Sequence, residues 1–92
     1  MILSFADTDT EALYRGRRVA KFANISRVAT RKLQMLESAK EIRDLASPPN
    51  NRLEALKGDR KGQYSIRIND QWRICFRWEA TGPSDVTIVD YH

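Results

Sequence analysis

An alternation of apolar and polar residues in the second half of the chain constrains the fold more than any other feature. Large apolar side chains stand at every second position from Trp72 to Trp78, and the positions between them are Arg73, Cys75 and Arg77. Successive residues of a strand point to opposite faces, so this pattern predicts a half-buried β-strand.

The same alternation occurs just before this strand. Tyr64, Ile66 and Ile68 alternate with polar residues and predict a second strand. Asn69 and Asp70 follow it, and because both residue types tolerate positive φ, they predict a two-residue hairpin turn. A further turn is expected at 81–84, where Gly and Pro are adjacent, and a last strand at 86–91.

The first half of the chain has helical spacing after a short apolar opening. Residues 2–5 predict a short strand, and Asp7, Thr8 and Thr10 are candidate caps for a helix that runs to about Arg15, with Gly16 as its stop. A second helix is predicted from about Asn24, because its apolar residues recur at steps of three and four: Ile25, Ala29, Leu33 and Leu36. A shorter turn at 41–45 precedes a connector with paired prolines.

These elements predict one domain over residues 1–92. The order is β-α-α-β-β-β. The fold class is α+β, a two-layer domain with helices packed on one face of a mainly antiparallel sheet.

The charge is concentrated in two stretches of a chain whose net charge is +4. Residues 12–36 contain no acidic residue and carry Arg15, Arg17, Arg18, Lys21, Arg27, Arg31 and Lys32. Residues 57–77 carry Lys57, Arg60, Lys61, Arg67, Arg73 and Arg77 against two aspartates. A basic surface for a polyanion is expected; for the first stretch, a helix face that is merely solvated is an equal alternative.

Membranes and covalent or metal cofactors are not indicated. No strongly apolar helical face accompanies the basic charge, and no segment has the length of a membrane span, so a cytoplasmic protein is expected. The single Cys75 cannot form an internal disulfide and is expected to be a small buried hydrophobe. One histidine and one cysteine cannot build a zinc site, and the carboxylates are scattered, so we expect no metal and no cofactor.

The strand alternation places several arginines together. If Trp72, Ile74 and Phe76 face the helices, Arg73 and Arg77 lie on the other face, and Arg67 joins them. Guanidiniums on an open sheet face would suit phosphates. The alternative, pairing with acidic residues across strands, is slightly favoured for Arg67 and Arg77 but not for Arg73.

The only histidine, His92, is the last residue. A lone terminal histidine is most often uninformative, but here it ends a predicted strand as Asp90-Tyr91-His92. Strand alternation would place Asp90 and His92 on the same face, where the carboxylate would favour the protonated imidazole. His92 is therefore a candidate for proton transfer near neutral pH.

The second half of the sequence resembles a known family. The segment 51–62 contains Asn51-Arg52-Leu53 and Leu56-Lys57-Gly58-Asp59-Arg60-Lys61-Gly62, and it is followed by Tyr64 to Phe76 and by Val89-Asp90-Tyr91-His92. This series resembles the HigB group of the RelE/ParE superfamily, the toxins of bacterial type II toxin–antitoxin systems. The resemblance is specific over residues 51–92 and looser through the opening strand and helix pair.

The resemblance implies a ribosome-dependent endoribonuclease that cleaves messenger RNA during translation. The active-site positions that it carries over are Lys57, Arg73, Asp90, Tyr91 and His92. It also implies a cognate antitoxin of the HigA type with a helix-turn-helix domain, so that this chain would meet operator DNA only through the antitoxin complex.

The chemistry expected is attack of a ribose 2′-hydroxyl on the adjacent phosphorus. Arg73 and Lys57 would stabilise the negative charge, His92 would act as general acid with Asp90 orienting it, and Tyr91 would contact the nucleotide. The other basic residues expected to bind RNA or the ribosome are Arg17, Arg18, Lys21, Arg27, Arg31, Arg60, Lys61, Arg67 and Arg77.

Two other functions remain open. A non-catalytic inhibitor of DNA gyrase is known from the ParE branch of the same superfamily, but that branch has no reason to keep Lys57 and Arg73 together with the terminal Asp90-Tyr91-His92. A plain nucleic-acid-binding module is the other, and no helix-turn-helix pattern supports it.

Overall fold

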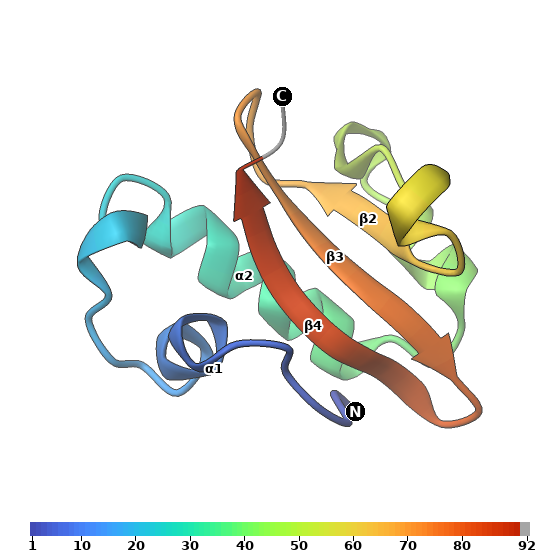
Figure 1. Ribbon diagram of the computed structural model, residues 1–92, viewed down its shortest axis with the longest axis horizontal. Helices are drawn as coiled ribbons and strands as arrows, with labels where there is room; N and C mark the ends of the chain where they lie inside the picture. The colour runs from blue at the N-terminus through green and yellow to red at the C-terminus, as the bar shows by residue number, and fades with distance from the viewer. Residues whose placement is uncertain (91–92) are drawn as a thin grey trace.

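The computed structural model describes residues 1–90 and shows two helices followed by a four-stranded sheet (Figure 1). The helices are α1 (Thr8–Tyr14) and α2 (Ser26–Ser38), and the strands are β1 (Glu54–Ala55), β2 (Tyr64–Arg67), β3 (Trp72–Glu79) and β4 (Gly82–Asp90). Short 3₁₀ turns connect them: η1 (Ala20–Phe22), η2 (Ile42–Ala46), η3 (Pro49–Asn51) and η4 (Gly58–Arg60). The strand order is β1-β2-β3-β4 with every neighbouring pair antiparallel, which confirms the α+β class and the meander.

The predicted N-terminal strand is not formed. Residues 2–5 run beside β4, but only Phe5 forms a bridge, a parallel one with Val86. β4 is irregular at this point, because Asp85 has φ +49° and the pairing with β3 shifts register between Cys75 and Arg77. A bulged strand offers no continuous row of partners, so the N-terminal segment makes only scattered hydrogen bonds.

A strand that the sequence did not predict, β1, forms the opposite edge of the sheet, beside β2. Glu54 pairs with Ser65 and Ala55 with Tyr64. Both residues of β1 are exposed. A two-residue edge strand without buried positions leaves no alternation to detect.

The helix boundaries follow from their caps. Asp7 accepts a hydrogen bond from the Thr10 amide at 2.9 Å and begins α1. Gly16, with φ +84°, ends it, and its amide donates to the Leu13 carbonyl, as predicted. The second helix begins at Ser26, two residues after the predicted start.

The predicted two-residue turn at Asn69-Asp70 is wrong. β2 ends at Arg67 and β3 begins at Trp72, and neither turn residue has positive φ. Instead, the Asn69 side-chain oxygen accepts hydrogen bonds from the amides of Gln71 and Trp72, both at 2.8 Å. A side-chain acceptor that mimics the backbone stabilises a wider loop without positive φ.

The second predicted turn is also displaced. Gly82 pairs with Glu79, so 82–84 already belongs to β4 and the turn is at Ala80-Thr81. Pro83 is tolerated in the strand, where it lies opposite Trp78.

The core lies between α2 and one face of the sheet, which we call the helix face. Buried residues of α2 (Ala29, Leu33, Leu36) belong to one cluster with buried strand residues (Ile66, Ile74, Phe76, Val86, Ile88). Phe22 packs edge-on against Trp72, with ring centroids 5.5 Å apart, and this contact fixes Trp72 on the helix face as predicted. Cys75 is a free, fully buried thiol, and burial raises its pKa.

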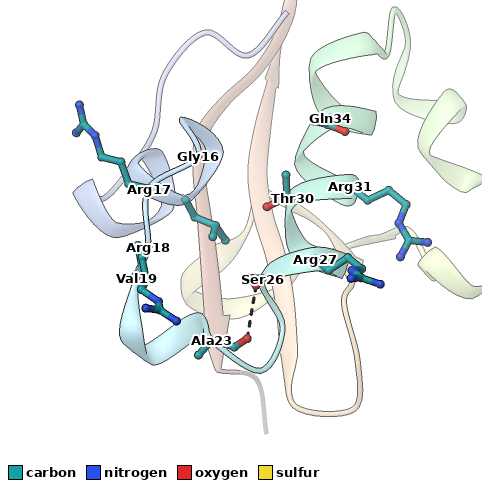
Figure 2. Close-up of a pocket in the computed structure, with 11 residues that line it drawn as sticks. Gly16, Arg17, Arg18, Val19, Ala23, Ser26, Arg27, Thr30, Arg31 and Gln34 are labelled. Carbon is teal, nitrogen blue, oxygen red and sulfur yellow. Dashed lines mark hydrogen bonds between the residues drawn. The ribbon is translucent and has the colours of Figure 1, made fainter.

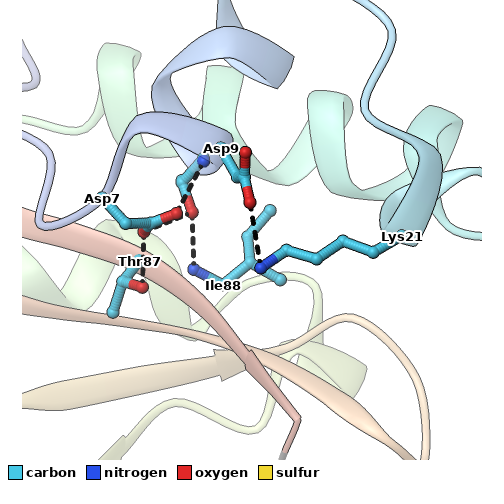
Figure 3. Close-up of polar contacts among 6 residues, drawn as sticks. Asp7, Asp9, Lys21, Thr87 and Ile88 are labelled. Carbon is cyan, nitrogen blue, oxygen red and sulfur yellow. Dashed lines mark hydrogen bonds and ion pairs between the residues drawn. The ribbon is translucent and has the colours of Figure 1, made fainter.

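A polar network ties the start of α1 to β4 (Figure 3). The hydroxyl of Thr10 donates to an Asp7 carboxylate oxygen at 2.8 Å and accepts from the Ile88 amide at 3.0 Å. Thr87 donates to the same Asp7 oxygen at 2.7 Å, and Lys21 pairs with Asp9 at 3.1 Å. The network holds the start of α1 against Thr87 and Ile88 of β4, next to the part of β4 beside which residues 2–5 run.

Replacing Thr10 by valine should destabilise the protein. The side chain is fully buried and valine has nearly its shape, so the change removes the hydroxyl and leaves the Ile88 amide without its acceptor. We expect a loss of about 1–3 kcal/mol in the free energy of unfolding, measured by urea denaturation. Thr8→Val, an exposed threonine in the same helical turn, should change it by less than about 0.5 kcal/mol. Equal effects at both positions would contradict this role of Thr10.

The Asp7 carboxylate should make stability depend on acid pH. Burial would raise the pKa of Asp7, but hydrogen bonds from Thr87 and Thr10 and the charge of Lys21 outweigh it and hold the pKa below 3.8. The stabilisation is therefore complete above about pH 4 and is lost as the pH falls through the lowered value. Asp7→Asn should be less stable than the parent at neutral pH, and the gap should narrow toward pH 2. A gap that is constant with pH would contradict the assignment, whereas an upward shift of the Asp7 pKa in Thr87→Val, followed by NMR, would support it.

Candidate active face and basic cavity

Arg73 lies on the sheet face opposite α2, which we call the outer face, and it is only 8% exposed. Its Nε donates to the Ser65 hydroxyl at 2.7 Å, and its Nη2 donates to the Arg52 carbonyl at 2.7 Å. Glu54 lies 3.2 Å from Nη2. The contacts with Ser65, the Arg52 carbonyl and Glu54 hold the guanidinium over β2 and against β1.

The outer face is therefore not the open surface that the alternation suggested. Ser65, Arg73 and Cys75 are all buried on it. The cause is the unpredicted β1 and the residues around it, since they bring the Arg52 carbonyl and Glu54 against the Arg73 side chain.

The other two strand arginines are paired with acidic residues, the alternative that the sequence favoured for them. Arg67 forms an ion pair with Asp70 in the β2–β3 loop, and Arg77 lies 3.5 Å from Asp85. One amino group of Arg77 lies 3.1 Å from where a side chain at Gly62 would begin, so this glycine lets the loop approach Arg77. Both arginines remain partly exposed.

Residues around η4 add positive charge beside this face. Arg60 donates to the Gln63 side chain at 3.1 Å. The charges of Arg60 and Arg73 both act on the Cys75 thiol, against the dominant effect of burial, so both arginines lie near the outer face. Lys57 and Lys61 flank η4 and are exposed.

Two further predicted catalytic residues, Lys57 and Asp90, lie toward the ends of the sheet. Asp90 ends β4 opposite Trp72, and Gln71 donates to its carboxylate at 3.0 Å. The register places Ala55 opposite Tyr64 and Tyr64 opposite Phe76. Phe76 lies four residues after Trp72 along β3, so the level of Ala55 in the sheet is about 13 Å from that of Asp90. Lys57 follows β1 beyond Ala55, so the register leads Lys57 and Asp90 toward opposite ends of the sheet. Asp90 pairs with Trp72 and therefore starts on the helix face, whereas Arg73 lies on the outer face. Tyr91 and His92 lie outside the described residues.

The N-terminal basic residues do not lie with this set. Arg17, Arg18, Arg27 and Arg31 line a cavity of about 540 Å³ between the Gly16–Val19 loop and α2 (Figure 2). Lys21 is directed elsewhere, since its ammonium pairs with Asp9 and lies 5.2 Å from the Phe22 ring centre. The structure thus divides the predicted RNA-binding residues into two groups.

Two polar residues gained a role that the sequence reading did not give them. Ser65 holds Arg73, and strand alternation could have found it because Ser65 and Arg73 have the same parity in paired strands. Lys32 is buried and donates to Asn51, whose amide donates to the carbonyls of Leu45 and Ser47. Burial lowers the pKa of Lys32, and the charges of Arg31 and Arg67 lower it further. Lys32 lies three residues after Ala29 and four before Leu36, so its spacing already placed it on the apolar face of the helix and could have predicted its burial.

Within residues 1–90 no cluster of three or more His, Cys, Asp or Glu side chains is placed to hold a metal ion. Over the same part of the chain, neither helix is long and apolar enough to cross a membrane.

Comparison with known proteins gives the class and then the family. The fold is similar to the YoeB–YefM complex from Staphylococcus aureus, with a TM-score of 0.58 and 17% identity over 100% of this chain and 98% of that one. It therefore has the architecture of the YoeB/RelE-like toxins. A sequence profile described as "RelE-like toxin of type II toxin-antitoxin system HigB" matches residues 3–92.

Two curated relatives agree with this profile. Toxin HigB-1 of Vibrio cholerae serotype O1 is 37% identical over 100% of this chain and 98% of its own length. Endoribonuclease HigB of Proteus vulgaris is 36% identical over 66% of this chain and 65% of its own length. The chain belongs to the HigB-like family of RelE-type toxins from type II toxin–antitoxin systems, and such a toxin implies a cognate antitoxin.

Proposed function

We propose that this HigB-like toxin is a metal-independent, ribosome-dependent endoribonuclease that cuts messenger RNA during translation and so inhibits growth. Family membership supports it, and a relative from Proteus vulgaris is named an endoribonuclease. The observation that carries the proposal is Arg73, a guanidinium held from three sides on the outer face. A cation fixed before the substrate arrives stabilises developing charge without the cost of reorganising it.

The proposed reaction needs no group beyond the protein and the RNA. The ribose 2′-hydroxyl gives its proton to a general base, its oxygen bonds to the adjacent phosphorus, and the bond from phosphorus to the 5′-oxygen breaks. The products are a 2′,3′-cyclic phosphate and a free 5′-hydroxyl, so electrons and protons balance. Arg73 and Lys57 offset the negative charge on the phosphorane, and His92 donates a proton to the departing oxygen.

Asp90 and Tyr91 complete the assignment. Asp90 orients and charges the imidazole of His92, and Tyr91 contacts the nucleotide by stacking. The general base is left unassigned. General acid–base catalysis of this kind raises the rate by about 10²–10⁴. Orientation of the messenger RNA by the ribosome supplies the remaining rate enhancement.

The proposed partners follow from the same assignment. A HigA-type antitoxin with a helix-turn-helix domain neutralises the toxin and represses the operon with it. The ribosome and messenger RNA are bound through the basic residues of the outer face (Arg60, Lys61, Arg67 and Arg77) and through the N-terminal basic segment (Arg17, Arg18, Lys21, Arg27 and Arg31).

Mapping RNA ends tests the proposal. Transcripts translated in the presence of the purified toxin should carry new 5′-hydroxyl and 2′,3′-cyclic phosphate ends, and the same transcripts without ribosomes should stay nearly intact. EDTA added to a ribosome-free RNA substrate cut at high toxin concentration should not reduce cleavage. Intact transcripts together with damaged DNA after induced expression would instead indicate a gyrase inhibitor and refute the nuclease.

A further inference from the structure

The cavity between the Gly16–Val19 loop and α2 has a composition that the cleavage chemistry does not use. Apolar walls come from Leu13, Val19 and Ala23. Three polar residues of α2, Ser26, Thr30 and Gln34, follow one another at steps of four, so they lie along one line of the helix surface. The volume of about 540 Å³ is that of a small-molecule site.

Four arginines surround this cavity and no acidic residue lines it. In Figure 2, Arg17 turns outward from its loop, and Arg27 and Arg31 extend from α2 on the side away from that loop. Their guanidiniums therefore lie outside the cavity, and their aliphatic stems contribute to its walls.

Within the described residues 1–90, these four arginines form no ion pair. Among residues 1–90, the ion pairs of arginine involve Arg15, Arg43, Arg67, Arg73 and Arg77, and none involves the four at the cavity. Four uncompensated positive charges around one cavity repel one another, and an anionic partner relieves that repulsion.

We infer that this cavity binds one unstacked base of a single-stranded RNA, with the neighbouring phosphates held by the arginines that line the cavity and extend outside it. The apolar walls accept the flat faces of the base, and the hydroxyl and amide groups of α2 reach its polar edge. Arginines outside the cavity match a chain whose charge runs along its backbone and whose bases project from it.

An acidic polypeptide is the rival occupant, and the geometry favours it less. A peptide carries its carboxylates on side chains along both sides of its path, so guanidiniums within a groove would suit it better than guanidiniums that extend outside a cavity. The inference rests on the proposed function in taking RNA as the ligand, and it adds a second RNA site away from Arg73.

The test uses a short single-stranded 2′-O-methyl oligoribonucleotide that carries one 2-aminopurine. This RNA cannot be cut through its 2′-oxygen, so binding is measured whether or not the protein is a nuclease. Insertion of the base should change the 2-aminopurine fluorescence, and Thr30→Met, which fills the cavity and keeps every charge, should weaken binding by about 10-fold. Ser38→Met adds the same side chain to an exposed site of α2 outside the cavity and should leave binding unchanged.

Variants that remove one positive charge test the arginines of the cavity separately. Arg18→Gln and Arg27→Gln should each weaken binding and lower the slope of log affinity against log salt by about 0.7. Arg43→Gln removes the same charge from an exposed arginine outside the cavity and should leave that slope unchanged.

Three results would overturn the inference. Thr30→Met could bind RNA as well as the parent does, polyphosphate could displace the oligonucleotide as well as unlabelled RNA does, or polyglutamate could compete more strongly than RNA. A separate co-sedimentation experiment with ribosomes shows whether the bound RNA is ribosomal RNA or messenger RNA. Weakened binding of Thr30→Met to ribosomes without messenger indicates ribosomal RNA, weakened binding only to messenger-loaded ribosomes indicates messenger RNA, and no change in either refutes the site.

Discussion

Arg73→Lys is expected to lower the rate of RNA cleavage by about 10²–10³. Lysine keeps the positive charge beside Glu54, but one ammonium cannot reproduce the fork that bonds the Ser65 hydroxyl and the Arg52 carbonyl at 2.7 Å each. The charge that meets the phosphorane would then be displaced and mobile. Cleavage of a reporter messenger by translating ribosomes, in single turnover, measures the loss.

The controls separate chemistry from folding. Arg77→Lys makes the same exchange at a partly exposed arginine paired with Asp85 and should change the rate by less than about threefold. Ser65→Ala keeps Arg73 and removes the hydroxyl that orients its guanidinium. Its cleavage rate should therefore lie between those of Arg77→Lys and Arg73→Lys. Thermal denaturation identifies a temperature at which all variants are folded. If Arg73→Lys is as active as the parent there, Arg73 has no part in transition-state stabilisation.

His92→Gln is expected to abolish growth arrest and to reduce messenger cleavage by about 10²–10⁴. A glutamine amide forms hydrogen bonds but cannot donate a proton to the leaving 5′-oxygen at neutral pH. Histidine and glutamine are both polar and similar in size, so the free energy of unfolding should stay within about 0.5 kcal/mol of the parent value. Transcript lengths after induction, together with purified-ribosome assays, give both readouts.

The matching control introduces a glutamine at a position outside the proposed active site. Lys40→Gln alters an exposed side chain at the end of α2 and should leave cleavage and growth arrest intact. Full cleavage by His92→Gln would remove the imidazole from the mechanism, and the basic faces would then be read as binding surfaces alone.

Local signals predicted most of the elements. The alternation around Ile66, Ile74 and Phe76 gave β2, β3 and the face that packs on α2, because burial of one sheet face leaves a period of two in the sequence. The spacing of Ala29, Leu33 and Leu36 gave α2 for the corresponding reason. Asp7 and Gly16 marked the ends of α1 because caps are local hydrogen-bond motifs.

Where the prediction failed, partners far apart in the chain decided the outcome. Residues 2–5 have strand-like apolar character, but the bulge at Asp85 leaves them no continuous edge to join. Conversely, Glu54 and Ala55 have no strand pattern and pair because β2 offers them an edge. Turn geometry at Asn69 also differed, because a side-chain acceptor replaced positive φ.

The candidate site divides in the same way. By itself the sequence determined which side chains are available for chemistry, and the family resemblance selected Lys57, Arg73, Asp90, Tyr91 and His92 among them. Only the tertiary structure decided that Arg73 is buried against Ser65 and Glu54, and that four other arginines surround a separate cavity. Residue type and spacing are local properties of a chain, whereas burial and charge pairing depend on which distant segments fold against each other.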